Sequence, residues 1–364
     1  MEINQLKAKN YSILVGKNSI SCLASEVRNH CPKCKKIAVV IDKKIPKKFL
    51  VRIKKNLKKY KVFIFFISSS EKIKNLEQTN FLINKLLELN FNRSDLIIAL
   101  GGGIIGDMTG FVASIFKRGI NFINLPSTLL SQVDSCIGGK TGINSKHGKN
   151  LIGSFYNPKV VISETELLKS LPKREIICGY AEILKHAIIN DKKFFNFLKK
   201  NTKNLILLEN KTLNQSILKS CKIKLNFTEK DFKEKSLRMR LNFGHTFAHA
   251  LEIQNKYSNK LNHGEAVLIG MLIATRVSKF KNLCSNNTLA QVENLYQKFS
   301  LTKNLNKYFK KKEILKSIKF MKNDKKKDDE KVSLILLNNI GKTTVPGKFK
   351  YKINQIENLI KDLF

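Results

Sequence analysis

The sequence is poor in acidic residues and has no segment typical of export or membrane insertion. Asp and Glu number 28 against 68 Lys and Arg in 364 residues, for a formal net charge of +40. The first residues lack the order of basic, apolar and small residues that marks a signal peptide. The apolar run at residues 96–116 contains four glycines before Asp107, which argues against a transmembrane helix. We therefore expect a soluble, cytoplasmic protein with no membrane partner.

Cysteine is also sparse. There are seven cysteines, an odd number scattered along the chain, which argues against a disulfide framework and suits a reducing compartment. Cys31 and Cys34 form a C-x-x-C pair with no second Cys or His pair near them. We interpret them as ordinary thiols.

The positive charge permits two interpretations. A nucleic-acid-binding protein would gather its lysines on one arm or face. Here the lysines are spread over the whole chain, and aromatic residues lie in apolar runs such as VFIFFI. A composition rich in Asn, Ile and Lys, with attraction of an anionic substrate, accounts for the charge. We therefore expect no nucleic-acid partner.

Apolar runs alternate with helical patterns in the first half of the chain. Buried strands are predicted at residues 11–15, 37–41, 62–67, 96–100, 122–125 and 160–162, and a helix at 76–89. This order predicts an α/β domain over residues 1–170, with a mostly parallel, Rossmann-like sheet covered on both faces.

The pattern changes at about residue 171, where a helix is predicted to begin. The chain then has an almost wholly helical pattern to about residue 322, followed by a charge run at 322–331 that predicts a loop. Residues 332–337 and 343–345 predict a small hairpin, and a last helix is predicted from residue 353. We therefore predict a mainly α-helical second domain over residues 171–364.

A glycine-rich turn follows the predicted strand at residues 96–100. Gly101, Gly103 and Gly106 satisfy G-x-G-x-x-G between a strand and a helix, where glycines let the backbone approach a pyrophosphate. No acid stands about twenty residues further on, where one would bind the ribose. Asp42 ends another predicted strand and is our candidate for that acid, because parallel strands share one carboxyl edge.

Basic and small polar residues fill the next stretch, residues 118–150. Lysines and one arginine stand among glycines there, a combination that suits phosphate or carboxylate binding. The alternative is a mobile, solvated basic loop. Asp134 and Asn150 favour a binding site, since a solvated loop does not need these added polar groups.

Histidines of the second half suggest a metal site. Glu182 shares a helix face with Lys185, and His245, His249 and His263 fall within nineteen positions. Two histidines and a glutamate can hold zinc with one open position, where a hydroxyl or carbonyl would be polarised. Spacing leaves the pair open between His245 with His249 and His245 with His263.

Seven blocks resemble, in order and spacing, the signature blocks of the 3-dehydroquinate synthase family. They are GGGIIGD, LPSTLLSQVDSCIGGKTGIN, GKNLIGSFYNP, GYAEILKHAII, LNFGHTFAHALE, LNHGEAV and MKNDKK. The resemblance runs from Asp42 to near Gly341. It implies an NAD-binding α/β domain, a helical domain with zinc (or cobalt), and a homodimer.

The resemblance also implies a reaction in the shikimate route to aromatic amino acids. The small anionic sugar phosphate 3-deoxy-D-arabino-heptulosonate 7-phosphate becomes 3-dehydroquinate and phosphate. The implied steps are transient oxidation by NAD, phosphate elimination, reduction, ring opening and intramolecular aldol closure, with no net oxidation.

Matching the family's motifs residue by residue implies four sets of site residues. The metal ligands are Glu182, His245 and His263. The catalytic residues are His249, as proton shuttle, with Lys185, Asp134 and Lys140. The substrate contacts are Arg118, Asn150, Lys224, Arg238, Asn242 and Lys325. The NAD contacts are Asp42, Ser69, Ser70, Glu71, Lys72, Ile73, Lys74, Gly103, Ile104, Ile105, Gly106, Asp107, Ser127, Thr128, Lys140, Lys149, Leu167, Leu168, Lys169 and Ser170.

Five positions depart from the family pattern: Ser70, Ser127, Cys136, Phe232 and Ala248. None removes a proposed ligand or charge, so we predict that activity is kept. Phe232 stands where an acid is usual, and we expect it to loosen the approach to the pocket if it has any effect.

Two other enzyme classes compete with this interpretation. A related cyclase would act on another sugar phosphate and make an inosose- or valiolone-type product. Lys224, Arg238 and Asn242 argue against it, because they suit a substrate that bears a carboxylate. A metal-dependent alcohol dehydrogenase would release NADH in net turnover.

Overall fold

The computed structural model describes residues 3–258, 260–302, 305–324 and 331–363. The chain folds as two compact units. The first comprises Met1–Ile176 with Leu208–Leu225, and the second Ile177–Leu207 with Asn226–Phe364. Helices α5 (Lys173–Asn190) and α7 (Asn210–Lys230) contribute residues to both.

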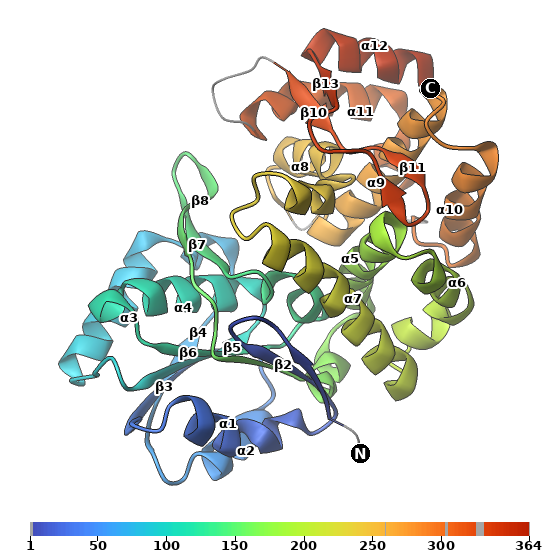
Figure 1. Cartoon of the computed structure of the whole chain (residues 1–364). Coiled ribbons are helices and arrows are strands. Elements are labelled where there is room, and N and C mark those ends of the chain that lie inside the picture. The colour runs from blue at the N-terminus through green and yellow to red at the C-terminus, as the bar shows by residue number, and fades with distance from the viewer. Residues whose placement is uncertain (1–2, 259, 303–304, 325–330, 364) are drawn as a thin grey trace. The chain divides into compact units, whose positions relative to one another are not determined.

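The first unit is built on one seven-stranded sheet. Its strands are β1 (Asn4–Lys7), β2 (Ser12–Gly16), β3 (Lys36–Asp42), β4 (Lys61–Ile67), β5 (Leu96–Gly101), β6 (Asn121–Pro126) and β9 (Val160–Glu164). Their order is β1-β2-β9-β6-β5-β3-β4 (Figure 1). β1 pairs antiparallel with β2, and the remaining neighbours are parallel. The predicted mostly parallel sheet is confirmed, whereas the short edge strand β1 was not predicted.

Helices cover both faces of this sheet. They are α1 (Leu23–His30) and α2 (Lys47–Asn56) on one face and α3 (Leu76–Glu88) and α4 (Gly103–Ile115) on the other (Figure 1). Val39 packs in a core cluster with Phe49 of α2, and its neighbour Val40 packs with Leu82 of α3. Successive side chains of a strand point to opposite faces. A strand that is apolar throughout, such as β3, therefore needs a helix layer on each side.

An antiparallel ribbon of β7 (Lys140–Ser145) and β8 (Gly148–Phe155) extends from the first unit. The sequence analysis predicted no strand there, because glycines and lysines interrupt the apolar pattern of a strand. Gly142 pairs with Gly153, and a Cβ on Gly153 would lie 2.2 Å from the Thr141 carbonyl oxygen. A Cβ on Gly110 would lie 2.6 Å from Thr141 Cγ2, so the ribbon packs closely on α4. The glycines that hide the strands from the pattern are those that allow this packing.

The second unit is mainly helical. Besides parts of α5 and α7 it contains α6 (Lys192–Ile206), α8 (His245–Gln254), α9 (His263–Phe280), α10 (Asn286–Lys298), α11 (Lys311–Ile318) and α12 (Ile353–Leu363), with the 3₁₀ turns η6 (Leu237–Asn242), η7 (Asn306–Phe309) and η8 (Lys319–Asp324). The predicted last helix from residue 353 is confirmed by α12. Within the described ranges, no helix has the length and apolar character needed to cross a bilayer.

A hairpin turns where it was predicted, at Ile340 and Gly341, but the bounds predicted for its strands are wrong. β10 (Val332–Leu334) pairs with β13 (Phe349–Tyr351), and β11 (Leu337–Asn339) pairs with β12 (Lys342–Thr343). The apolar run at 332–337 therefore breaks into two strands, because its first half pairs with a segment beyond the turn. Most of the predicted loop at 322–331 lies outside the described residues.

Candidate functional site

The glycine turn lies at the carboxyl edge of the sheet in the first unit. β5 ends at Gly101, and α4 begins at Gly103 after an extended N-cap, Gly102, that makes no side-chain capping bond. A Cβ on Gly103 would lie 3.1 Å from Ser135 Oγ, and one on Gly106 3.2 Å from Asn124 Nδ2. The first N–H groups of a helix lack partners within it, and the helix dipole there favours an anion. The turn therefore combines close packing on β6 with a helix start suited to phosphate.

The other predicted NAD contacts of this unit follow neighbouring strands. Asp42 ends β3, is 8% exposed, and accepts a hydrogen bond from the Lys44 backbone N–H at 3.0 Å. Residues 69–74 follow β4 and include the 3₁₀ turn η2 (Glu71–Ile73), Ser127 and Thr128 follow β6, and η5 (Thr165–Ser170) follows β9. Since these strands are parallel, the structure places the four segments and the glycine turn at one edge of the sheet.

Lys74 joins the glycine-turn helix to the ribbon. Its Nζ lies 2.6 Å from Asp107 Oδ2 in α4 and donates to Asn150 Oδ1 in β8 at 2.5 Å. Lys74 is only 4% exposed. Burial raises the pKa of the Asp107 carboxyl above its ordinary value, although the Lys74 charge opposes the shift. Three predicted contact residues from separate segments thus form one network, in which Lys74 is buried and Asn150 is exposed.

Asn144 was missed by the sequence analysis, yet it binds the same segments together. Its backbone N–H donates to the Lys74 carbonyl at 2.7 Å, and its Nδ2 donates to Glu71 Oε2 at 2.8 Å. Its Oδ1 accepts the Asn150 N–H at 3.0 Å, and Lys149 Nζ lies 3.3 Å from Glu71 Oε1. Its partner Glu71 lies 73 residues away in sequence. No local signal distinguishes this asparagine from the many others in the chain.

The remaining predicted residues of the first unit divide into two groups. Lys224 of α7 is 7% exposed and contacts Asp134, which lies in the π-helical turn η4 (Ser131–Ser135). The Lys224 ammonium donates to the Asp134 backbone carbonyl at 2.7 Å and also to the Asp134 carboxylate. Lys140 is exposed at the start of β7. Arg118 follows α4 at the amino edge of the sheet, about 20 Å along that helix from the glycine turn. Arg118 is therefore not brought together with the glycine turn.

In the second unit, glycines let three helices approach closely. A Cβ on Gly264 in α9 would lie 2.3 Å from the Cys178 Cα of α5, and one on Gly270 would lie 2.1 Å from the Gly244 carbonyl oxygen before α8. Gly244 itself has φ +79°, a conformation that favours glycine. These contacts bring the first residues of α8 and α9 next to α5.

A Glu-His-His cluster results at this junction. The carboxylate of Glu182 on α5 is fully buried, and its Oε1 lies 3.5 Å from Nε2 of both His245 and His263, the first residues of α8 and α9. One ligand atom from each residue lies within 4.8 Å of the others. The structure thus groups His245 with His263, while the His249 ring stands perpendicular to that of His245 with centroids 5.3 Å apart. A carboxylate and two imidazoles fit Zn²⁺ or a similar ion with an open position.

The charges around the cluster suit metal ligation. Burial opposes ionisation of Glu182, but Lys185, whose ammonium contacts the carboxylate, and the two histidines lower its pKa well below the usual value. Burial and the Lys185 charge lower the pKa of His245. Burial would also lower the pKa of His263, but hydrogen bonds with Glu182 and Glu252 raise it to about 10. Glu182 and His245 are therefore in their ligating forms, and His263 would release a proton on metal binding.

Outer contacts hold the second nitrogen of each ring. His245 Nδ1 lies 3.3 Å from the Phe243 carbonyl oxygen, and His263 Nδ1 lies 3.4 Å from Glu252 Oε1. Glu252 was not among the predicted site residues. Its spacing of seven from His245 and three from His249 on one helical face was the signal that could have found it.

Two of the predicted substrate residues of the second unit, Arg238 and Asn242, lie in η6. Arg238 is 3% exposed and its Nη1 donates to the Phe232 carbonyl at 2.6 Å. Asn242 Nδ2 donates to Glu234 Oε1 at 2.9 Å. Because Phe232 holds Arg238 through its backbone, the unusual side chain at that position does not remove this contact. Lys325 lies outside the described residues.

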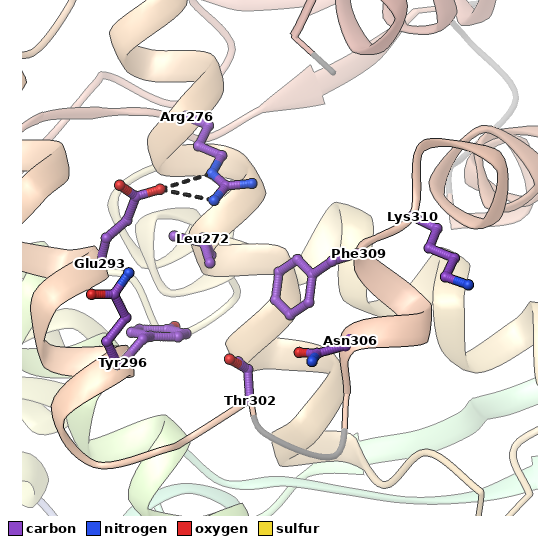
Figure 2. A pocket seen from close by; sticks show the side chains of 9 residues that line it. Leu272, Arg276, Glu293, Tyr296, Thr302, Asn306, Phe309 and Lys310 are labelled. Atoms are coloured by element: carbon purple, nitrogen blue, oxygen red, sulfur yellow. Dashed lines mark hydrogen bonds and ion pairs between the residues drawn. The ribbon is translucent and has the colours of Figure 1, made fainter.

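A separate cavity of about 410 Å³ lies between α9, α10 and η7 in the second unit (Figure 2). Arg276 and Glu293 form an ion pair at its wall, with Nε and Nη2 each 2.9 Å from Oε1. Leu272, also in the wall, is nine residues from His263, or about 14 Å along α9. None of the predicted site residues lines this cavity.

The fold is that of the sugar phosphate cyclases. A 2-deoxy-scyllo-inosose synthase complexed with carbaglucose-6-phosphate, NAD⁺ and Co²⁺ matches with a TM-score of 0.88 at 23% identity, over 99% of this chain and 100% of that one. Within this class the sequence is more specific. The N-terminal 3-dehydroquinate synthase family model matches residues 64–178, and the C-terminal one residues 179–327. The chain belongs to the 3-dehydroquinate synthase family.

Individual relatives agree with this assignment. The 3-dehydroquinate synthase of Pelagibacter ubique (strain HTCC1062) is 47% identical over 345 residues, which cover 95% of this chain and 94% of the relative. That of Campylobacter concisus (strain 13826) is 42% identical over 318 residues, or 86% and 88% of the two chains. The family resemblance seen in the sequence blocks is confirmed.

Proposed function

We propose that the chain converts 3-deoxy-D-arabino-heptulosonate 7-phosphate to 3-dehydroquinate and phosphate, with NAD and a divalent metal bound. The observation that carries the proposal is the cluster of buried Glu182 with His245 and His263 in a chain that matches the family over both of its parts. The sequence blocks around these three residues are among those that carry the family resemblance.

Residues 1–170 are proposed to bind NAD. The start of α4 would face the pyrophosphate, where its N–H groups and dipole stabilise negative charge. Asp42 would accept hydrogen bonds from a ribose, and the hydroxyls of Ser127 and Thr128 stand at the same edge of the sheet. Bound NAD would supply a reversible hydride acceptor. Lys74 bonds Asn150, and Asn144 joins Asn150 to Glu71, so these residues would not need to reorganise on binding.

Residues 171–364 are proposed to bind the metal and much of the substrate. Glu182, His245 and His263 would hold Zn²⁺ or Co²⁺. The bound ion would act as a Lewis acid that lowers the pKa of a substrate hydroxyl. Lys185 sits against Glu182 and keeps it ionised. His249, with its ring next to His245, would carry a proton to or from the substrate.

Basic residues would bind the two anionic groups of the substrate. In the second unit Arg238 can bind a carboxylate or phosphate in a bidentate way, and Asn242 can add a hydrogen bond. In the first unit Lys224 is held by Asp134, which fixes its ammonium. Lys140, Asn150 and Lys325 are proposed to complete the set of contacts, whereas the place of Arg118 at the amino edge of the sheet gives its predicted contact no support. We also propose that the protein is a cytoplasmic homodimer. Light scattering would test the oligomeric state, and cell fractionation would test the location.

A coupled assay tests the reaction. Purified protein with NAD⁺, Zn²⁺ and 3-deoxy-D-arabino-heptulosonate 7-phosphate should release phosphate and form 3-dehydroquinate in equal amounts. Chelation should stop both, and NADH should not accumulate. Phosphate release only from another sugar phosphate would indicate a related cyclase. NADH accumulation with a simple alcohol would indicate a dehydrogenase.

A further inference from the structure

We infer that Glu252 is a positioning residue of the metal centre, which holds His263 by Nδ1 so that Nε2 points at the metal. The inference rests on the proposed function, because it assigns a residue to the metal site that the proposal requires. Glu252 belongs to none of the predicted sets of site residues.

The geometry places the His263 ring between two carboxylates. Nε2 lies 3.5 Å from Glu182 Oε1, and Nδ1 lies 3.4 Å from Glu252 Oε1. Glu252 is 9% exposed, so its carboxylate has lost most of its hydration and depends on protein partners. The approach of Gly270 to Gly244 fixes α9 against α8, the helix that carries Glu252. Contacts at both Nε2 and Nδ1 therefore set the orientation of the His263 ring.

The same arrangement recurs at His245. Its Nε2 faces Glu182, and its Nδ1 lies 3.3 Å from the backbone carbonyl of Phe243. In both rings the outer acceptor would keep the proton on Nδ1 and leave Nε2 as the ligand. A carboxylate in this place also makes the ligating nitrogen more basic. Of these two outer acceptors, Glu252 is the one that a side-chain substitution can remove.

A simpler role for Glu252 makes the opposite prediction. Glu252 would then only pair with protonated His263 and stabilise the metal-free protein. In that case its removal would destabilise the metal-free protein and leave metal affinity unchanged or higher. If Glu252 positions the ligand, its removal must weaken metal binding.

Metal affinity of the full-length protein separates the two roles. Metal-free wild type, Glu252→Gln and Glu293→Gln are titrated with Zn²⁺ in competition with a chromophoric chelator at neutral pH. We expect Glu252→Gln to bind Zn²⁺ about 10- to 100-fold more weakly. Glu293→Gln is the matched control. It removes a carboxylate of α10 that pairs with Arg276 of α9, the helix that begins with His263, but this pair lies at the separate cavity (Figure 2). Its affinity should equal that of the wild type.

A second variant keeps the test decisive if Glu252→Gln does not fold. Glu252→Asp retains the charge but shortens the side chain, so the carboxylate no longer reaches Nδ1 at its present distance, and Zn²⁺ affinity should again fall. The absorption spectrum of the Co²⁺-loaded variants should also change with the altered ligand geometry. Wild-type Zn²⁺ affinity in a folded Glu252 variant would overturn the inference. Failure of the wild type to bind Zn²⁺ at all would instead overturn the proposed metal centre.

Discussion

The two units hold their candidate site residues in different ways. In the first unit these residues stand on segments that follow parallel strands, and hydrogen bonds such as Asn144 to Glu71 connect them across long stretches of sequence. In the second unit they stand on or beside helices that glycines allow to approach, as at Gly264 and Gly270. The first arrangement depends on a few polar bonds at one edge, and the second on the packed core. Changes in the first should alter binding, whereas changes in the second should alter stability and metal binding together.

The largest effect is expected for Glu182→Gln. The change leaves the Lys185 ammonium, 2% exposed, without its charged partner and removes a metal ligand. Breaking a buried ion pair from one side costs about 3–5 kcal/mol. Urea unfolding of the metal-free protein and Zn²⁺ titration would measure both losses. A variant with unchanged stability would show that the cluster is not coupled to the core as argued.

Gly270→Ala and Gly103→Ala compare the two units directly. In α9 the new Cβ would lie 2.1 Å from a backbone oxygen that cannot move aside, so overpacking should cost about 3 kcal/mol. At the start of α4 it would lie 3.1 Å from the Ser135 hydroxyl, a side-chain atom that can rotate away. The midpoint temperature of thermal unfolding should therefore drop sharply for Gly270→Ala and little for Gly103→Ala. NAD⁺ affinity should fall for Gly103→Ala, since the methyl group occupies the proposed phosphate-binding turn. Equal stability of the two variants would contradict the comparison.

Asn144→Ala should weaken NAD⁺ binding by about tenfold, the equivalent of one or two lost hydrogen bonds. The fold should be kept, because Asn144 lies on the ribbon rather than in a core cluster. Asn121→Ala is the control: Asn121 Nδ2 bonds the Ser94 and Asp95 carbonyls at the opposite edge of the same sheet. Calorimetric titration with NAD⁺ should separate the two variants. The same loss in both would show that sheet stability, not the ribbon contact, sets the affinity.

What could be predicted from sequence follows the same division. The parallel strands of the sheet and the start of α5 were predicted because their apolar runs and flanking residues are local signals. The ribbon β7–β8 was not, since its strands are held by glycine contacts with each other and with α4. The candidate site residues were predicted from family blocks, but spacing alone left His249 and His263 as equal candidates for the second histidine ligand. Asn144 contacts Glu71, 73 residues away in sequence, and Glu252 contacts the first residue of the next helix. Arg118 shows that closeness in sequence to the glycine turn does not imply closeness in space.

The smallest effect is expected at a loop of the second unit that is held by polar bonds, like the segments at the sheet edge of the first unit. The Asp231 carboxylate accepts backbone N–H bonds from Lys235, Ser236 and Arg238 at 2.8–3.0 Å. Burial opposes its ionisation, but these bonds lower the pKa of Asp231 below its ordinary value. A depressed pKa contributes stability that is present above the unfolded-state pKa, about 3.9, and is lost as pH falls through the folded-state value.

Asp231→Asn should therefore lower the free energy of unfolding by about 1 kcal/mol at neutral pH, a figure reduced for solvent screening. The difference from the wild type should begin to shrink as the pH falls below about 4, the unfolded-state pKa, and should vanish below the depressed pKa at which the folded carboxylate is protonated. Urea midpoints at pH 7 and pH 3 would measure it. The variant should also have a higher KM with little change in kcat, because the turn places Arg238. A stability difference that does not depend on pH would mean that the Asp231 charge has no part in holding this loop.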